Sequence, residues 1–343
     1  MNGPTTDRDA AFLAHHLAAI RDAARRTAAV VRRTPLLPGD DVAADLALKP
    51  ELLQRTGSFK VRGAFNAILG LRERDPDLPG VIAVSSGNHG QAVALAARAV
   101  GLRCVVVMPA DSNPAKVAAV RALGAEVITE GITAANREQR VVDLQQRTGL
   151  ALVHPFDDWE VIHGQGTIGL ELLEDSPELG LVVCPVGGGG LVSGCALAVK
   201  AQRPEVLVCG VEPETAADAA SSWRSGRHER LPAPPVTAAD GLRSLSLGQR
   251  GFEVMVERAL VDAIVTVSEA EIEAATLAAW TRLHLAIEPS AAVPLAAVLA
   301  HRLPPVRSGA VTAVVLSGGN ADPAWMARLL TRAAIPIGHA SGP

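Results

Sequence analysis

The chain has 343 residues, of which 48% are hydrophobic and 20% are charged. This length and composition fit one large or two smaller globular domains with a buried core, and they exclude a disordered chain. Acidic residues outnumber basic residues by 36 to 32, which argues against binding to nucleic acid or to an anionic membrane surface.

The N-terminus and the cysteines indicate a reducing compartment. Asp7, Arg8 and Asp9 interrupt any apolar stretch at the start, so we expect no secretory signal. The four cysteines form neither a C-x-x-C pair nor a zinc-type spacing: Cys104, Cys184, Cys195 and Cys209. We interpret them as small buried hydrophobic residues and predict a cytoplasmic protein.

Residues 179–199 contain no charged side chain and are long enough to span a bilayer. Pro185 and the glycines at 187–190 interrupt this run, so a strand, a loop and a helix explain it better than a membrane helix. We therefore expect neither a membrane nor a nucleic acid as a partner.

Short β-branched runs alternate with helical runs through most of the chain. Strands are predicted over 81–85, 103–109, 126–129, 181–186, 206–211, 264–267 and 312–317. Helices are predicted over 88–100, 113–123, 134–148 and 191–202, and after Ser268, which forms a capping-box pattern with Glu271. The alternation predicts an α/β fold whose parallel strands are covered on both faces.

Glycine-rich turns follow three of these strands, where ligands of such folds bind. The turns are S-S-G-N-H-G-Q (85–91), P-V-G-G-G-G-L-V-S-G (185–194) and L-S-G-G-N (316–320). The run of Gly187, Gly188, Gly189 and Gly190 would offer bare backbone amides to a phosphate. It lacks the features of a nucleotide P-loop or a dinucleotide fingerprint, and glycine count alone fits a tight turn equally well.

Lys60 lies in T-G-S-F-K-V-R-G-A (56–64), among apolar and small residues. A surface lysine with a buried stem is the ordinary interpretation. A desolvated amine would instead have a lowered pKa and act as a nucleophile or base. A lysine that forms imines, together with a separate phosphate cradle, suggests pyridoxal 5'-phosphate.

The other two turns carry further candidates. Ser85 and the amides of its turn could hold a carboxylate, and Asn88 could donate to a phenolic oxygen or simply cap a helix. His89 by itself does not indicate a particular function. Opposite a pyridine nitrogen, the Ser317 hydroxyl would not force a proton onto that nitrogen, which suits the elimination of a β substituent.

Taken together, these motifs resemble the fold-type II pyridoxal phosphate enzymes of the threonine dehydratase and serine racemase family. The matching stretches are E-L-L-Q-R-T-G-S-F-K-V-R-G-A, S-S-G-N-H-G-Q, H-P-F-D-D, G-Q-G-T, P-V-G-G-G-G, G-V-E-P, A-D-G, I-E-P-S-A and L-S-G-G-N. They occur in family order from about residue 35 to 322. The resemblance implies two open parallel-sheet α/β domains, as in tryptophan synthase β: a large one (1–79 and 156–343) and a small mobile one (80–155).

The resemblance also implies roles for single residues. Lys60 would carry the cofactor as a Schiff base and move the substrate's Cα proton. Cofactor-binding roles fall on Phe59, Lys60, Asn88, Gly187, Gly188, Gly189, Gly190 and Ser317, and substrate-binding roles on Ser85, Ser86, Gly87 and His89.

Ser86 matches the second acid–base residue of serine racemases, where many dehydratases have alanine. It could equally cap a turn, and dehydratases with serine at this place exist. The stretch H-P-F-D-D (154–158) is the dehydratase form of its motif. We therefore place dehydratase before racemase.

The stretch G-V-E-P-E-T-A-A-D (210–218) matches a divalent-cation site of relatives of serine racemase. The resemblance assigns the ligands to Glu212, the Ala216 carbonyl and Asp218, with Asp240 acting through water. Oxygen ligands suit Mg²⁺ or Ca²⁺. The alternative is an ordinary acidic loop.

We accordingly expect a homodimeric ammonia-lyase that dehydrates threonine or serine to a 2-oxo acid and ammonia. The alternatives are an amino-acid racemase, a dehydratase of hydroxyaspartate or a similar catabolic amino acid, and a non-catalytic cofactor-binding protein. His163, where alanine is usual, could reshape the substrate pocket. We expect neither a C-terminal regulatory domain nor feedback inhibition by isoleucine.

Overall fold

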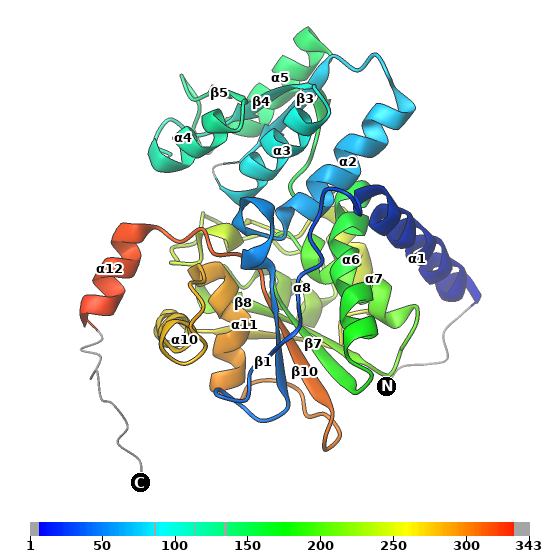
Figure 1. Ribbon diagram of the computed structural model, residues 1–343, viewed down its shortest axis with the longest axis vertical. Coiled ribbons are helices and arrows are strands. Elements are labelled where there is room, and N and C mark those ends of the chain that lie inside the picture. Colours follow the sequence, from blue (N-terminus) through cyan, green and yellow to red (C-terminus); the bar gives the residue numbers. More distant parts are fainter. Residues whose placement is uncertain (1–6, 86, 113, 134–135, 333–343) are drawn as a thin grey trace.

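The computed structural model describes residues 7–85, 87–112, 114–133 and 136–332. In these residues the strands form a large sheet of order β1-β2-β10-β7-β8-β9 and a small sheet of order β5-β4-β3-β6. Figure 1 shows the small sheet and its helices in the upper part of the molecule and the large sheet below. The predicted α/β fold with parallel sheets is confirmed.

The large sheet is apolar on both faces. Its strands are β1 (Leu37–Pro38), β2 (Leu46–Pro50), β7 (Leu179–Pro185), β8 (Leu207–Pro213), β9 (Ala263–Val267) and β10 (Val311–Leu316). Neighbouring strands pair in parallel, except that β1 is antiparallel to β2. Along β7, Val182 and Cys184 pack into one hydrophobic cluster, whereas Leu181 and Val183 pack into another. Side chains alternate between the faces, so burial of both faces produces the continuous apolar runs seen in the sequence.

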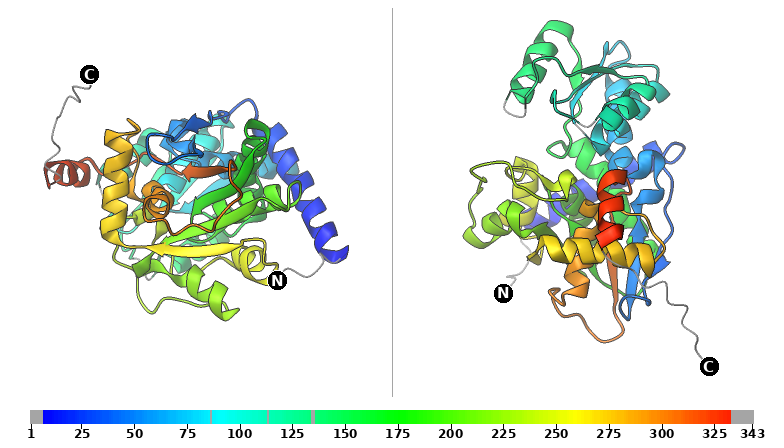
Figure 2. Two further views of the ribbon diagram at one scale, coloured as in Figure 1. Left: turned by 90° about the horizontal axis from the view of Figure 1, so that it is seen from below. Right: turned by 90° about the vertical axis from the view of Figure 1, so that its left-hand side faces the viewer.

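Helices cover each face of the large sheet. One face carries α1 (Asp7–Thr27), α6 (Trp159–Asp175), α7 (Gly190–Lys200) and α8 (Asp218–Ser225), and the other carries α10 (Glu269–Thr281) and α11 (Pro289–Leu299). The predicted capping box of Ser268 and Glu271 is confirmed at the start of α10. In Figures 1 and 2, α1 and the last helix, α12 (Pro323–Arg332), lie on opposite sides of the molecule.

Shorter helical turns connect these elements. They are η1 (Glu51–Leu53), η2 (Arg55–Gly57), η3 (Glu214–Ala216), η4 (Asp240–Leu242), α9 (Gln249–Phe252) and η5 (Glu253–Glu257). Several lie at the carboxyl ends of strands of the large sheet, and two of them, η1 and η2, lead directly into α2 (Lys60–Arg74).

The small sheet comes entirely from residues 80–152. Its strands are β3 (Gly80–Val84), β4 (Arg103–Val107), β5 (Glu126–Ile128) and β6 (Ala151–Leu152), and its helices are α3 (Asn88–Ala99), α4 (Pro114–Ala122) and α5 (Arg137–Thr148). All its strand pairs are parallel. Val61, Phe65 and Ile68 of α2 join the cluster that packs on one face of β3 and β4. The helix that begins with Lys60 therefore connects the two sheets.

The strands and helices that the sequence predicts lie where expected, within two or three residues at the ends, whereas helices such as α2, α6 and α11 were not predicted. Residues 179–199 divide into β7 and α7, as expected, and no helix within the described residues is long and apolar enough to cross a membrane. The four cysteines, all in the described part of the chain, are buried and free. The strands β1, β2 and β6 were not predicted, because β1 and β6 have two residues each and β2 contains Lys49 and Pro50. The helix starts predicted at 113 and 134 lie outside the described residues.

Candidate active site

Three chain segments meet at the carboxyl edge of the large sheet. The turn after β10 carries Ser317, the turn after β7 carries the four glycines, and Lys60 begins α2. In parallel sheets this edge collects the loops that bind ligands. Asn88, at the start of α3, reaches the same place from the small sheet.

The Lys60 amine is directed into the protein. Its Nζ donates to the Pro155 carbonyl oxygen at 2.8 Å and lies 4.9 Å from the centroid of the Phe59 ring. Burial lowers the pKa of Lys60 to about 8, although the Glu288 carboxylate acts in the opposite direction. A lysine with such a pKa is partly neutral near pH 7.5, which a surface lysine is not.

Backbone contacts hold the segment before Lys60 against the turn after β10. Phe59 N donates to Ser317 O at 3.0 Å, and Gly319 N donates to Gly57 O at 2.9 Å. Gly57 has φ +70°, and a Cβ there would lie 2.7 Å from Asn320 Oδ1, so only glycine fits. These contacts bring Lys60 and buried Ser317 together, although more than 250 residues separate them in the chain.

The glycine turn packs closely against Phe156, the residue after Pro155, whose carbonyl oxygen accepts from Lys60. A Cβ on Gly188 would lie 2.2 Å from Phe156 Cδ2, and a Cβ on Gly190 would lie 2.9 Å from Phe156 O. Gly189 has φ +89° and is the N-cap of α7, which receives no side-chain cap from the described residues. Packing therefore requires glycine here, and the same turn leaves the N-terminus of α7 available to an anion.

Asn88 is fixed by two side chains, one from the N-cap of α11 and one from the turn after β10. Its Nδ2 donates to Glu288 Oε1 at 2.7 Å, and its Oδ1 accepts from Asn320 Nδ2 at 2.8 Å. The N-cap of α3 is Gly87, so interpreting Asn88 as a helix cap is wrong. These partners orient the amide and leave its second N–H as a donor.

Glu288 is a candidate site residue that the sequence reasoning did not assign. It is buried, its backbone N donates to Gly318 O at 3.1 Å, and burial, followed by Asp240, raises its pKa to about 7. Glu288 lies in I-E-P-S-A, one of the stretches that carry the family resemblance, and this match is the signal that could have found it.

The turn 85–91 is only partly described. Gly87 N donates to Ser85 Oγ at 3.1 Å. His89 is buried, with Nε2 against Val153 O at 2.8 Å, and burial together with the Lys60 charge lowers its pKa to about 3. Its ring therefore stays neutral and holds α3 next to β6. Ser86 lies outside the described residues.

The predicted cation ligands lie at the carboxyl end of β8. Glu212 is buried and accepts from the amides of Ala219 and Ala220 at 3.1 and 2.8 Å. Among the described residues, no hydrogen-bond partner reaches Asp218 Oδ2, which is buried. Burial raises the pKa of both carboxyls, that of Asp218 to about 7.

These two carboxylates fit a divalent cation, because their buried charges and the unpartnered oxygen need a positive group. No cluster of three acidic, histidine or cysteine side chains able to hold a metal occurs in the described residues. A site here therefore depends on a backbone ligand such as the Ala216 carbonyl, whose residue is buried in η3.

The structure gives two predicted residues other partners. Asp240 forms an ion pair with Lys116 and raises the pKa of Glu288, and its role at the cation site stays a prediction. His163 Nε2 contacts His16 Nδ1 of α1 at 2.8 Å and stacks on Trp159. Its ring faces α1, so the expectation that it reshapes the substrate pocket is wrong.

Comparison with known proteins identifies the family. Residues 28–318 match the family described as pyridoxal-phosphate dependent enzyme. The chain belongs to this family. L-threonine ammonia-lyase of Thermotoga maritima is 41% identical over 324 residues, which cover 93% of this chain and 79% of that protein. Serine racemase of Arabidopsis thaliana is 41% identical over 310 residues, which cover 88% and 92%.

Solved structures of relatives have the same fold as this pyridoxal-phosphate dependent enzyme. A threonine deaminase from T.th. has a TM-score of 0.83 at 50% identity and covers 89% of this chain and 98% of its own. Maize serine racemase has a TM-score of 0.85 at 36% identity and covers 92% and 97%. The resemblance to the threonine dehydratase and serine racemase family is confirmed.

The site around Lys60 fits the cofactor of these pyridoxal-phosphate dependent enzymes. The amine has the lowered pKa that imine formation needs. The uncapped N-terminus of α7 lies across Phe156 and Pro155 from that amine, which suits a phosphate joined to an aldehyde-bearing ring. Asn88 is linked to this site through Glu288, and Ser317 through the backbone hydrogen bond from Phe59.

Proposed function

We propose that this enzyme is an ammonia-lyase that converts a β-hydroxy amino acid, such as threonine or serine, to a 2-oxo acid and ammonia. The observation that carries the proposal is the Lys60 amine, partly neutral at physiological pH and held between Pro155, Phe59 and Glu288. The 50% identity to a threonine deaminase structure, against 36% to a serine racemase structure, supports elimination as the main reaction.

Pyridoxal phosphate, when bound, supplies an electron sink for the pair left when the substrate Cα loses its proton. Lys60 would hold the cofactor, with Phe59 beside the ring and the amides of Gly187, Gly188, Gly189 and Gly190 around the phosphate. Asn88 Nδ2 would donate to the phenolic oxygen, and the Ser317 hydroxyl would face the ring nitrogen. These assignments are the ones that the resemblance to the family implies for the matching positions.

Lys60 Nζ would then act as the base that takes the Cα proton. The Cβ–O bond breaks, the hydroxyl group takes up a proton and leaves as water, and the resulting enamine is hydrolysed to a 2-oxo acid and ammonia. Ser85, Ser86, Gly87 and His89 belong to the turn that would bind the substrate carboxylate. The Ser317 hydroxyl would not force a proton onto the ring nitrogen, which would suit elimination of the hydroxyl group.

Racemisation is the second candidate, because the Arabidopsis thaliana relative is named serine racemase and because Ser86 lies in the carboxylate turn. A proton returned to the opposite face of Cα needs a second acid, and Ser86 would supply it. Chiral analysis of the residual serine distinguishes this reaction from elimination. Ser86→Ala should then lose racemisation and keep elimination.

A divalent cation, Mg²⁺ or Ca²⁺, is proposed for Glu212, Asp218 and the Ala216 carbonyl. The proposal rests on Asp218 Oδ2, which is buried and has no hydrogen-bond partner in the part of the chain that the structure describes, and on the second buried carboxylate beside it. Closure of a small domain (80–155) over substrate is likewise proposed, because Lys60, Asn88 and Lys116 all make contacts between the two halves. The homodimer and the cytoplasmic location stay predictions from the sequence.

The first prediction tests the reaction itself. We expect release of ammonia and a 2-oxo acid from at least one member of a panel of β-hydroxy amino acids that includes hydroxyaspartate. Lys60→Ala should lower that rate by about 10²–10⁴-fold, because the base is lost. Assays with Mg²⁺ and with chelator show whether the cation is needed. No release from any substrate, with the cofactor still bound, would contradict the proposal.

A further inference from the structure

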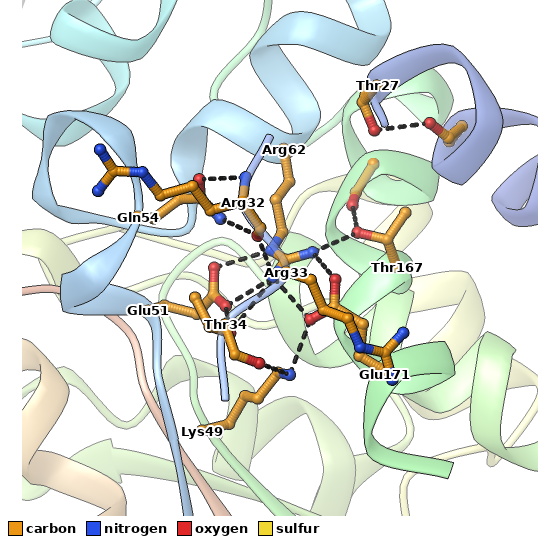
Figure 3. Close-up of polar contacts among 12 residues, drawn as sticks. Thr27, Arg32, Arg33, Thr34, Lys49, Glu51, Gln54, Arg62, Thr167 and Glu171 are labelled. Carbon is orange, nitrogen blue, oxygen red and sulfur yellow. Dashed lines mark hydrogen bonds and ion pairs between the residues drawn. The ribbon is translucent and has the colours of Figure 1, made fainter. Parts of the chain in front are cut away.

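A buried ionic network lies directly behind the helix that carries Lys60. Figure 3 shows this Arg62 network, which consists of Thr34, Lys49, Glu51, Arg62, Thr167 and Glu171. Arg62 and Lys49 are the two largest fully buried side chains of the described residues, with 1% and 0% of their surface exposed. Two cations face two carboxylates, and Lys49 also lies 3.6 Å from Asp175 at the edge of the network.

The Arg62 guanidinium uses all its N–H groups. Its Nε and Nη2 bind both oxygens of Glu51 at 2.8 Å, and its Nη1 and Nη2 bind both oxygens of Glu171 at 2.6 and 2.9 Å. Nη1 also donates to Thr167 Oγ1 at 3.0 Å. Two bidentate pairs fix the position and the plane of the guanidinium, which a single ion pair would not do.

The remaining members hold the two carboxylates in place. Thr34 Oγ1 donates to Glu51 Oε1 at 2.6 Å. Lys49 Nζ lies 2.7 Å from Glu171 Oε2 and donates to Thr34 O at 2.7 Å. The network therefore joins β2 and η1 to α6, with the first turn of α2 between them.

Arg62 follows Lys60 by two residues, a rotation of about 200° around a helix, so the two side chains leave α2 in opposite directions. The Lys60 amine extends to Pro155, whereas the Arg62 guanidinium extends into the network. Behind them, a Cβ on Gly164 would lie 2.5 Å from both Arg62 O and Gly63 Cα, so α6 supports the backbone directly.

Stability alone does not explain such a network. Hydrophobic side chains of similar volume often replace a buried ion pair without loss of stability. What a network of fixed geometry provides beyond stability is one defined position for the backbone atoms attached to it. Here those atoms include the first turn of α2, and its first residue is Lys60.

We propose that Arg62 is a positioning residue for the Lys60 amine: its two bidentate ion pairs hold the first turn of α2 so that Nζ meets the cofactor and the substrate Cα in one orientation. This inference rests on the proposed role of Lys60. A shift of about 1 Å in a reacting group can lower the rate about 10²-fold. The position of the Lys60 amine should therefore depend on the bidentate geometry of the Arg62 guanidinium as well as on its charge.

The test uses the holoenzyme of the Arg62→Lys variant, which keeps the positive charge but cannot form the two bidentate ion pairs. We expect kcat to fall about 10²-fold with little change in KM. Circular dichroism of the cofactor's visible absorption band should weaken at unchanged cofactor content, because this signal reports how the ring is held. Wild-type values of both kcat and the visible signal in Arg62→Lys would overturn the proposal.

Lys200→Met is the matched control. Lys200 is also a buried cation, 9% exposed, and its Nζ lies 2.8 Å from Asp262 Oδ2 at the far end of α7. We expect this variant to melt at a lower temperature with unchanged kcat and visible signal per folded enzyme. Equal losses of kcat and signal in both variants would mean general destabilisation and would also overturn the proposal. Should Arg62→Lys not fold, Glu171→Gln, which weakens one of the two bidentate ion pairs, gives the same readouts.

Borohydride reduction separates this inference from the proposed function. Reduction of the wild-type holoenzyme followed by peptide mapping should find the cofactor attached to Lys60. Attachment to another lysine would refute the role of Lys60, whatever the Arg62 variants show. Attachment to Lys60 with unaffected Arg62→Lys enzyme would refute only the positioning role.

Discussion

At the scale of single residues, the environment of each ionisable group decides what it can do. Lys60 and Lys116 are both lysines near the site, yet Lys60 is desolvated and Lys116 is paired with Asp240. Glu288, close to Lys60, is a buried carboxyl whose pKa is raised to about 7. A partly neutral amine beside a carboxyl that can hold a proton is suited to moving protons at neutral pH.

The cation site gives a prediction at the same scale. Mg²⁺ or Ca²⁺ should raise the melting temperature of the wild type, because an ion bound only by the folded state stabilises it. At 100 times its dissociation constant, the cation contributes about 2.7 kcal/mol. Asp218→Asn should abolish most of this rise.

Glu214→Gln is the control for the cation site, because Glu214 is an exposed acid in the neighbouring turn and pairs with Arg302. Its response to the cation should equal that of the wild type. If Asp218→Asn responds like the wild type as well, the cation binds elsewhere or not at all.

At the scale of elements, α1 is held on α6 by aromatic and histidine rings. His16 of α1 lies 2.8 Å from His163 of α6, between Phe12 and Trp159. Burial, followed by the neighbouring His163, lowers the pKa of His16 to about 3. Burial also lowers the pKa of His163 to about 4, and the Arg26 charge acts in the same direction. Both rings are therefore neutral in the folded protein over the physiological range.

This pair predicts a loss of stability in acid. The unfolded chain binds protons at its histidines below about pH 6.5, whereas the folded pair takes them up only near pH 3 to 4. The contribution of this pair to the free energy of unfolding should therefore be complete above pH 6.5. Below that pH it should fall by up to about 1.4 kcal/mol per pH unit for each histidine.

Thermal unfolding between pH 7.5 and 5 checks this prediction. His163→Ala should reduce the slope of melting temperature against pH. His301→Asn should leave it unchanged, because His301 is exposed and asparagine tolerates its φ of +52°. Identical slopes in the wild type and His163→Ala would show that the pair does not titrate as described.

At the scale of the whole molecule, the site lies between two sheets that have separate cores. Lys116 of α4 and Asp240 of η4 form an ion pair from one half to the other, and both side chains are partly exposed. Asn88 and Glu288 make a second connection. Both contacts hold the two sheets together over the Lys60 site.

The ion pair of Lys116 and Asp240 predicts a salt-dependent KM. Exposed pairs contribute about 0.2–1 kcal/mol and are screened by salt. Lys116→Ala should therefore raise KM by up to about fivefold and remove part of its dependence on ionic strength. Steady-state kinetics at low and high salt provide the measurement.

Arg103→Ala serves as the control, because Arg103 and Glu126 form an exposed ion pair within the small sheet. This change should leave KM and its salt dependence as in the wild type. The proposed contribution of Lys116 to closure is wrong if Lys116→Ala keeps the full salt dependence.

The sequence by itself determined the features that depend on neighbours along the chain. Short apolar runs predicted the buried parallel strands, and glycines after them predicted the loops at their carboxyl ends. Lys60 and the glycines at 187–190 were found because their unusual local context is visible within a few residues. The short strands β1 and β6 were missed because two residues carry no periodicity.

Only the tertiary structure decided which distant residues meet. Asn88 and Glu288 are 200 residues apart, His16 and His163 are 147 apart, and Arg62 and Glu171 are 109 apart. A carboxylate, an imidazole or a guanidinium looks the same in the sequence whether it faces solvent or a buried partner. The burial, the pKa and the partners of such a group arise only when the two sheets and their helices pack together. For Lys60, this packing buries the amine against Pro155 and lowers its pKa.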